Sequence, residues 1–296
     1  AEEETEEDVF TPVAGSSGSL HCRPLGARLS IPLPVAPQLC EDASEEVVAE
    51  YEDLLVPSVT IETINEILGA ICDADASDMR WRLTARRFAV ANGGHVPNAI
   101  EHMREHKEWG SFIKPRLEVF PTNDVLLFRH GWDRQGHPLL VWNGPALNTA
   151  HAATSTEDME LLLCAVVDEA LGLLDAGDHL CSASGAGQGA RPPWRLQKCT
   201  FILYAPPGSE PPWSKVSPVL RTLQRNYPER LYRALIFPVS MFTTFFWNIG
   251  KVFLDKQTTK KVVFLTGGLR PQGLLDYVAP EHLPEDFVPD CHDTLA

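Results

Sequence analysis

Cysteine pairs with metal-ligand spacing are missing from this chain. Its seven cysteines are odd in number, scattered from Cys22 to Cys291, and never form a C-x-x-C unit. This pattern excludes the common zinc modules and a disulfide framework. We therefore expect a reducing compartment.

An excess of basic residues is also missing. The net charge is −15 at pH 7, of which residues 1–56 carry −11 and the remaining 240 residues only −4. Because no basic stripe marks a phosphate-binding surface, we expect no nucleic-acid partner. Residues 1–45 combine a Glu run, a Gly-Ser-Ser-Gly stretch and several prolines, and we interpret them as an acidic extended arm.

No catalytic constellation can be assembled from the motifs present. No serine occupies a nucleophile elbow, and the glycine-rich residues 185–189 follow no clear strand. His102 and His106 have the spacing of a metal pair, but charged neighbours surround them and no third ligand is evident. We expect a solvated helix face there, and we predict no enzyme, no catalytic residue and no metal site.

A long apolar segment free of breaks is not present either. The longest candidate, Ala234–Leu254, contains Pro238 and Lys251, and its polar residues recur at helical spacing along one stripe. We interpret it as a strand, Leu231–Pro238, and a separate amphipathic helix, Val239–Leu254, rather than as a transmembrane segment.

The rest of the chain divides into a helical and an α/β part. Helices are predicted after Thr60, from Met79 to Val90 and from Pro97 to Trp109, so we assign residues 46–112 to a helical N-terminal subdomain. In residues 113–296 strands alternate with helices, which is typical of a mostly parallel sheet. The predicted elements there are a hairpin (125–128 and 138–142), helices 156–176, 217–226 and 239–254, strands 199–204, 231–238 and 261–265, and a loop at 181–193.

Two opposite charges flank the last two predicted strands. Glu229 precedes strand 231–238 and Lys261 opens strand 261–265. If these strands are parallel and close in the sheet, connectivity places both side chains at one edge. Such a pair could bind hydroxyls and a phosphate, and a plain salt bridge is the alternative.

The predicted helix 239–254 is too apolar for an ordinary surface helix. Leaving its large side chains in water would cost about 1.5–3 kcal/mol each. Either the helix is buried in the core, or it covers a lipid cavity and meets a bilayer. The sequence alone leaves both open.

Several stretches, in the right order, resemble motifs of the CRAL-TRIO family. Residues 226–237 (NYPERLYRALIF) resemble the first half of its signature, and residues 247–265 (WNIGKVFLDKQTTKKVVFL) resemble the second. Residues 85–90 (ARRFAV), 133–138 (DRQGHP) and 281–284 (EHLP) resemble three further motifs. The resemblance spans the predicted helical and α/β parts.

The resemblance implies a CRAL-TRIO-like α/β fold: a mixed, mostly parallel sheet, a helical N-terminal subdomain, and an apolar lipid pocket closed by helix 239–254 as a gate. It also implies that Arg86, Glu229 and Lys261 bind the lipid headgroup. It implies no cofactor apart from the bound phospholipid. The residues expected to form the gate and pocket are Met241, Phe242, Phe245, Phe246, Ile249 and Phe253.

The chain departs from the family pattern at several positions. Pro238–Ser240 stands in place of N-A-P, Val252 replaces the proline of P-F-L-D, and Ala205 occupies a position that is usually acidic. The segment 208–229 is shorter than in family members, so contacts to a choline headgroup cannot be carried over.

The resemblance implies a lipid exchange protein. We expect it to bind and exchange or sense a phospholipid, in the first place phosphatidylinositol, with transient membrane contact and a cytoplasmic or peripheral membrane location. Because the chain begins with Ala1, an organelle interior after removal of a targeting segment is the alternative. A second hypothesis is a non-catalytic structural or interaction subunit of a larger assembly, with a protein partner bound through the arm 1–45. A carrier of a neutral hydrophobe is a third.

Overall fold

A computed structural model describes residues 56–71, 79–119, 126–146, 155–175, 198–209, 213–240, 247, 251 and 256–288. The predicted acidic arm 1–45, the loop 181–193 and most of the predicted helix 239–254 lie outside the described residues. Within the described ranges no helix is both long enough and apolar enough to cross a membrane.

The described part of the N-terminal unit contains three helices, all of them predicted: α2 (Ile61–Ile71), α3 (Met79–Ala91) and α4 (Val96–Val119). The Thr60 hydroxyl accepts a hydrogen bond from the Thr63 amide at 3.3 Å, which confirms the predicted cap of α2. Helix α4 continues through residue 112, the predicted end of the subdomain, to Val119. These helices share one apolar core: Val59, Ile64, Ile67, Leu68, Ala85, Phe88, Ala89, Ala99 and Met103.

A five-stranded sheet forms the centre of the α/β part, in the order β1-β2-β3-β4-β5. Strands β1 (Leu127–Trp132) and β2 (Pro138–Asn143) form the predicted antiparallel hairpin. Strands β3 (Cys199–Tyr204), β4 (Leu231–Phe237) and β5 (Val262–Phe264) continue the sheet in parallel. The predicted α/β class with a mixed, mostly parallel sheet is therefore confirmed.

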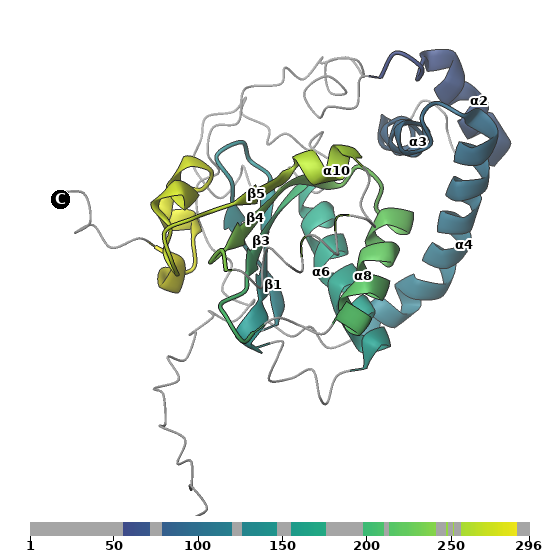
Figure 1. Cartoon of the computed structure of the whole chain (residues 1–296). Helices are drawn as coiled ribbons and strands as arrows, with labels where there is room; N and C mark the ends of the chain where they lie inside the picture. Colours follow the sequence, from purple (N-terminus) through teal and green to yellow (C-terminus); the bar gives the residue numbers. More distant parts are fainter. Residues whose placement is uncertain are drawn as a thin grey trace, which may run out of the picture.

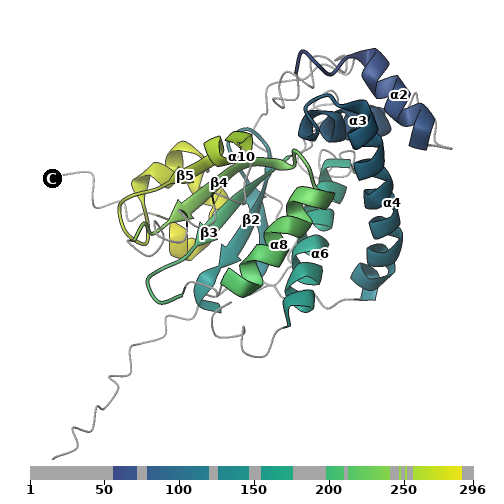
Figure 2. The same ribbon diagram turned by 45° about the vertical axis from the view of Figure 1, so that its right-hand side comes forward.

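Helices α6 (Thr156–Asp175) and α8 (Trp213–Asn226) lie on one side of the sheet (Figure 1, Figure 2). Helix α8 begins four residues earlier than predicted, with Pro218 inside it. The short helix α10 (Lys256–Lys260), which was not predicted, leads into β5. The 3-10 turns η2 (Gln272–Asp276), η3 (Pro280–His282) and η4 (Glu285–Phe287) lie on the other side of the sheet.

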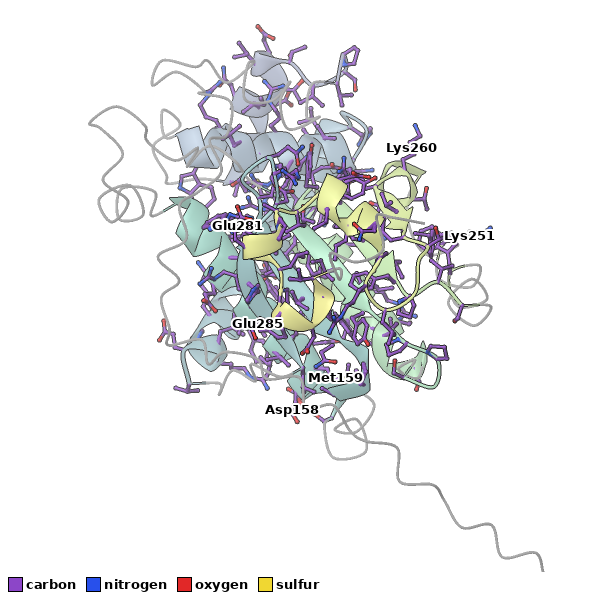
Figure 3. All side chains as sticks on the ribbon, turned by 90° about the vertical axis from the view of Figure 1, so that its left-hand side faces the viewer. Asp158, Met159, Lys251, Lys260, Glu281 and Glu285 are labelled. Atoms are coloured by element: carbon purple, nitrogen blue, oxygen red, sulfur yellow. The ribbon has the colours of Figure 1, made fainter. Side chains whose placement is uncertain are left out.

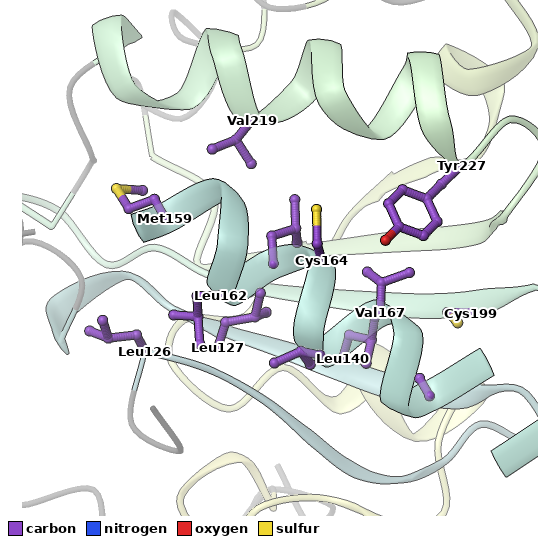
Figure 4. Close-up of a cluster of buried hydrophobic side chains, with 13 residues drawn as sticks. Leu126, Leu127, Leu140, Met159, Leu162, Cys164, Val167, Cys199, Val219 and Tyr227 are labelled. Atoms are coloured by element: carbon purple, nitrogen blue, oxygen red, sulfur yellow. The ribbon is translucent and has the colours of Figure 1, made fainter. Parts of the chain in front are cut away.

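The apolar stripe predicted for helix 156–176 is buried against the sheet. Met159, Leu162, Leu163, Val166 and Val167 pack in one cluster with residues of β1, β2 and β3 (Figure 4). Their spacing of three and four residues places them on one side of the helix. This cluster joins α6 and α8 to the hairpin.

A second apolar cluster covers the opposite face of the sheet. The ring of Phe287 from η4 lies 5.2 Å from that of Phe237 in β4 and 4.9 Å from that of Tyr204 in β3, centroid to centroid. Leu274 and Val278, both fully buried, pack into the same cluster. The C-terminal turns thus close this face.

A buried carboxylate fixes the hairpin turn. The Asp133 side chain is 2 % exposed and accepts hydrogen bonds from the amides of Gln135 and His137, both at 2.9 Å. The Thr200 hydroxyl of β3 donates to the same carboxylate at 2.6 Å. Because Gly136 has a φ of 91°, the turn uses a conformation that favours glycine. Asp133 therefore links the turn between β1 and β2 to strand β3.

The His102 and His106 side chains do not form a solvated face, so that prediction is wrong. The Nε2 of His102 donates to the Arg225 carbonyl at 2.7 Å, and His106 Nδ1 lies 3.5 Å from Asn226 Oδ1. The His106 ring also stacks on Trp109. Both imidazoles thus lie between α4 and the end of α8, where contacts with a distant part of the chain leave them half-buried. Within the described ranges, no group of three His, Cys, Asp or Glu residues could hold a metal ion.

Replacing Asp133 with Ala should destabilise the protein by about 3–5 kcal/mol, because buried donors on Gln135, His137 and Thr200 would lose their acceptor. Urea unfolding measures the loss. The exposed Asp276 provides the control, since Asp276→Ala should change stability by less than about 0.5 kcal/mol. Equal effects of the two substitutions would contradict the role of Asp133.

Burial lowers the pKa of His106 from 6.5 to about 4, with smaller contributions from Arg87, Arg230 and His102. The unfolded chain therefore binds one more proton than the folded chain between these values, and stability falls as the pH falls from 6.5 towards 4. His106→Phe keeps an aromatic ring and removes this proton uptake. Between pH 7 and pH 5 the wild type should lose about 2 kcal/mol more than the variant in urea unfolding. Parallel pH profiles would contradict the lowered pKa.

Candidate functional site

A carboxylate and an ammonium meet at the N-terminal edge of β4 and β5. Lys261 Nζ lies 2.9 Å from Glu229 Oε2, and the two side chains are only 15 % and 13 % exposed. The strands they precede are parallel neighbours, with Ala234 opposite Val262. The structure therefore confirms the juxtaposition predicted from connectivity.

Glu229 adopts a backbone conformation that a glycine would adopt more readily. Its φ is 56°, the only positive φ of a non-glycine residue in the described part of the chain. The Arg230 amide donates to the Tyr227 carbonyl at 3.2 Å, and Pro228 is the second residue of the four, which defines a type II turn. A left-handed conformation costs an L-residue about 1–2 kcal/mol. The fold thus holds a carboxylate at the point where the turn favours glycine.

Backbone hydrogen bonds fix the chain on both sides of this pair. The Tyr227 amide donates to the Leu223 carbonyl at the end of α8, and the Cys199 amide of β3 donates to the Arg230 carbonyl, both at 2.8 Å. The Lys261 carbonyl accepts from the Ala234 amide of β4 at 2.9 Å. The turn and the start of β5 are therefore both tied to the sheet.

A polar pair behind the turn, a buried tyrosine and a half-buried aspartate, was missed by sequence reasoning. The Tyr227 hydroxyl donates to Asp168 Oδ1 of α6 at 2.8 Å. Burial raises the pKa of Asp168, and Lys114 and Arg230 partly offset this rise. The pKa of Tyr227 is raised well above 10, mainly by burial and by the neighbouring Cys164 and Asp168. An aspartate directly after Val166 and Val167 in an apolar helix was the available signal.

One face of the sheet carries an apolar surface beside this edge. In β3 to β5 the side chains alternate, and Ile202, Leu235 and Val263 pack into the cluster under the C-terminal turns. The alternate positions therefore lie on the opposite face, which α6 and α8 cover over the hairpin and over Cys199 and Phe201 of β3. In β3 to β5 this face is formed by Phe201, Leu203, Ala234, Ile236, Val262 and Phe264.

Trp247 lies against this apolar face. Its ring centroid is 5.5 Å from that of Phe264, and the rings meet edge to face. Phe201, Leu203, Val262 and Phe264 are half-buried. The predicted gate and pocket residues Met241, Phe242, Phe245, Phe246, Ile249 and Phe253 lie outside the described residues.

The third predicted headgroup residue lies in the helical unit. Arg86 of α3 is 2 % exposed, and its guanidinium donates to the Val59 carbonyl at 3.5 Å. The structure thus brings Glu229 and Lys261 together and places Arg86 among α2, α3 and α4. The headgroup role of all three stays a prediction.

An open groove lies on the helical side of the molecule. It has a volume of about 600 Å³ and lies between α4, α6 and α8. Phe112, which is 63 % exposed, lies at this groove with Trp109 and Ile113. The ion pair between Arg225 and Glu105, 2.9 Å apart, flanks it. Charged and apolar side chains line it together, unlike the apolar face of the sheet.

Three findings relate this chain to known proteins. Residues 195–287 match the family model of the CRAL/TRIO domain. "Protein real-time" of Anopheles gambiae is 22 % identical over 289 residues, which cover 90 % of this chain and 40 % of that protein. The crystal structure of Sfh5 superposes with a TM-score of 0.48 and 14 % identity, over 76 % of this chain and 81 % of that one.

The family match covers strands β3, β4 and β5 and both residues of the charged pair. It also covers Trp247 and the three C-terminal turns. Residues 195–287 therefore match the CRAL/TRIO domain model, the family that the motifs of the sequence resemble.

Proposed function

We propose that this chain binds a phospholipid, phosphatidylinositol in the first place, and exchanges or senses it at membrane surfaces. A CRAL/TRIO domain supports the binding of a lipid or another small lipophilic ligand. The observation that carries the proposal is the Glu229–Lys261 pair, which lies at the edge of the sheet that bears the apolar face.

The two charged groups suit the two parts of an inositol phosphate headgroup. The Lys261 ammonium can bind a phosphate oxygen, and the Glu229 carboxylate can accept hydrogen bonds from ring hydroxyls. Because both side chains are mostly buried, these bonds would form in a region of low dielectric constant. The family resemblance assigns Arg86 to the same phosphate, and we retain it in the proposal.

The apolar face of β3 to β5 suits acyl chains. Each CH₂ group that leaves water for such a surface contributes about 0.8 kcal/mol. Binding and release need no covalent step, so we propose a non-catalytic carrier or sensor.

The proposed membrane contact is peripheral and on the cytoplasmic side. Lys251 and Lys260 are both exposed and lie on the same side of the molecule, away from Glu281 and Glu285 (Figure 3). Lysines in such positions are attracted to anionic lipids by about 1 kcal/mol each. Lys251 lies within the predicted gate helix 239–254, and Lys260 ends α10, which follows it.

A second candidate, an interaction subunit of a larger assembly, is favoured by the groove between α4, α6 and α8. An exposed aromatic ring such as that of Phe112, beside paired charges, is typical of protein interfaces. The chain also spans only 40 % of the length of its Anopheles relative. A partner that copurifies with the chain and is lost in Phe112→Asp would support this candidate.

Native extraction of bound lipid, followed by mass spectrometry, separates the two functions. The carrier predicts about one phospholipid per chain, enriched in phosphatidylinositol relative to the membranes of the expression host. Only trace, mixed lipid would contradict the carrier and favour the interaction subunit.

Lys261→Ala should lower phosphatidylinositol binding about ten-fold or more, because a charge-assisted hydrogen bond to the phosphate contributes about 1.5–3 kcal/mol. The exposed Lys107 of α4 is the control, and Lys107→Ala should leave binding within about two-fold. Transfer of labelled phosphatidylinositol between vesicles measures both, and circular dichroism checks the fold. Equal losses in the two variants would contradict the proposed headgroup site.

A further inference from the structure

We propose that Asp168 and Tyr227 are positioning residues that set the orientation of the Glu229 carboxylate and hence the selectivity for a hydroxyl-bearing headgroup. The inference rests on the proposed function and extends it to two side chains outside the headgroup site. Their role is to hold the turn, not to touch the ligand.

The link from Asp168 to Glu229 is short and rigid. Asp168 belongs to α6, and its Oδ1 accepts the hydroxyl of Tyr227 at 2.8 Å. Tyr227 begins the type II turn whose third residue is Glu229, and the turn closes on the Tyr227 carbonyl. Movement of Tyr227 would therefore be transmitted to the Glu229 backbone within two residues.

The packing of the Tyr227 ring limits its freedom. The residue is 8 % exposed, and its ring meets Trp109 of α4 edge to face at 5.8 Å. Its hydroxyl meets two polar groups of α6, the Asp168 carboxylate and the Cys164 thiol. The hydrogen bond to Asp168 is the charge-assisted one of the two and contributes most to fixing the depth of the ring in this cluster.

The turn is expected to relax when the contacts of Tyr227 are lost. Glu229 has a φ of 56°, a left-handed conformation that is unfavourable for a non-glycine residue. Loosening Tyr227 would let the turn move towards a negative φ and rotate the carboxylate away from Lys261. The surrounding contacts thus maintain a strained residue in its working orientation.

The protonation states support this arrangement. Because the pKa of Tyr227 is raised, the phenol keeps its proton at all physiological pH values and remains the donor. The carboxyl group of Asp168 accepts that bond through one oxygen. An amide oxygen could accept it equally well, so Asp168→Asn is a conservative replacement.

A double-mutant cycle between Tyr227→Phe and Glu229→Gln tests the proposal. Each protein is loaded from vesicles of equal parts phosphatidylinositol and phosphatidylcholine, and the ratio of the two bound lipids is measured by mass spectrometry. The ratio does not depend on the folded fraction, so modest destabilisation does not affect it. Tyr204→Phe, at the opposite end of β3, is the matched control.

Tyr227→Phe and Asp168→Ala should each lower the phosphatidylinositol preference about five-fold. Asp168→Asn should keep it within about two-fold of the wild type, as should Tyr204→Phe. In the Glu229→Gln background, Tyr227→Phe should cause no further loss, because its effect acts through the carboxylate.

Three outcomes would overturn the positioning role. They are an unchanged ratio in Tyr227→Phe, an equal loss with and without Glu229, or a loss in Asp168→Asn as large as in Asp168→Ala. A different outcome distinguishes failure of the proposed function itself. If Glu229→Gln leaves the lipid preference of an otherwise wild-type chain unchanged, the headgroup site is wrong, and the positioning role is overturned with it.

Discussion

The parallel pairing of β4 with β5 is the constraint on which the candidate site depends. Its register places Ala234 opposite Val262, so the residues that precede the two strands reach the same edge of the sheet. This pairing brings Glu229 and Lys261, 32 residues apart in the chain, to one edge, and the turn at 227–230 holds the carboxylate 2.9 Å from the ammonium. The same pairing aligns the apolar side chains of both strands on one face. The charged pair and the apolar face thus lie next to each other because of the backbone hydrogen bonds between β4 and β5.

Local patterns were sufficient to predict most of the secondary structure. The spacing of Met159, Leu162 and Val166 predicts one buried face of α6, and the turn at Asp133–Gly136 predicts the hairpin. The charged pair followed from strand order alone. Each of these predictions uses neighbours in the sequence or the known handedness of parallel connections.

Contacts between distant segments account for what the sequence did not predict. Asp168 meets Tyr227 across 59 residues, and His106 meets Asn226 across 120. The residues next to His106 in the chain are charged, so the local composition predicts a solvated helix face. The end of α8 and Phe88 of α3 cover part of that face and leave the imidazole half-buried. Burial of this kind is a property of tertiary packing and leaves no periodic signal.

The left-handed backbone of Glu229 sets two selective pressures against each other. A single-base change of a glutamate codon gives glycine, which would relieve the strained turn. The same change would leave the mostly buried Lys261 ammonium without its carboxylate, so relief of the turn and loss of the ion pair act in opposite directions. Persistence of an acidic residue here during evolution in the laboratory would therefore show that the interactions of the carboxylate outweigh the cost of the turn.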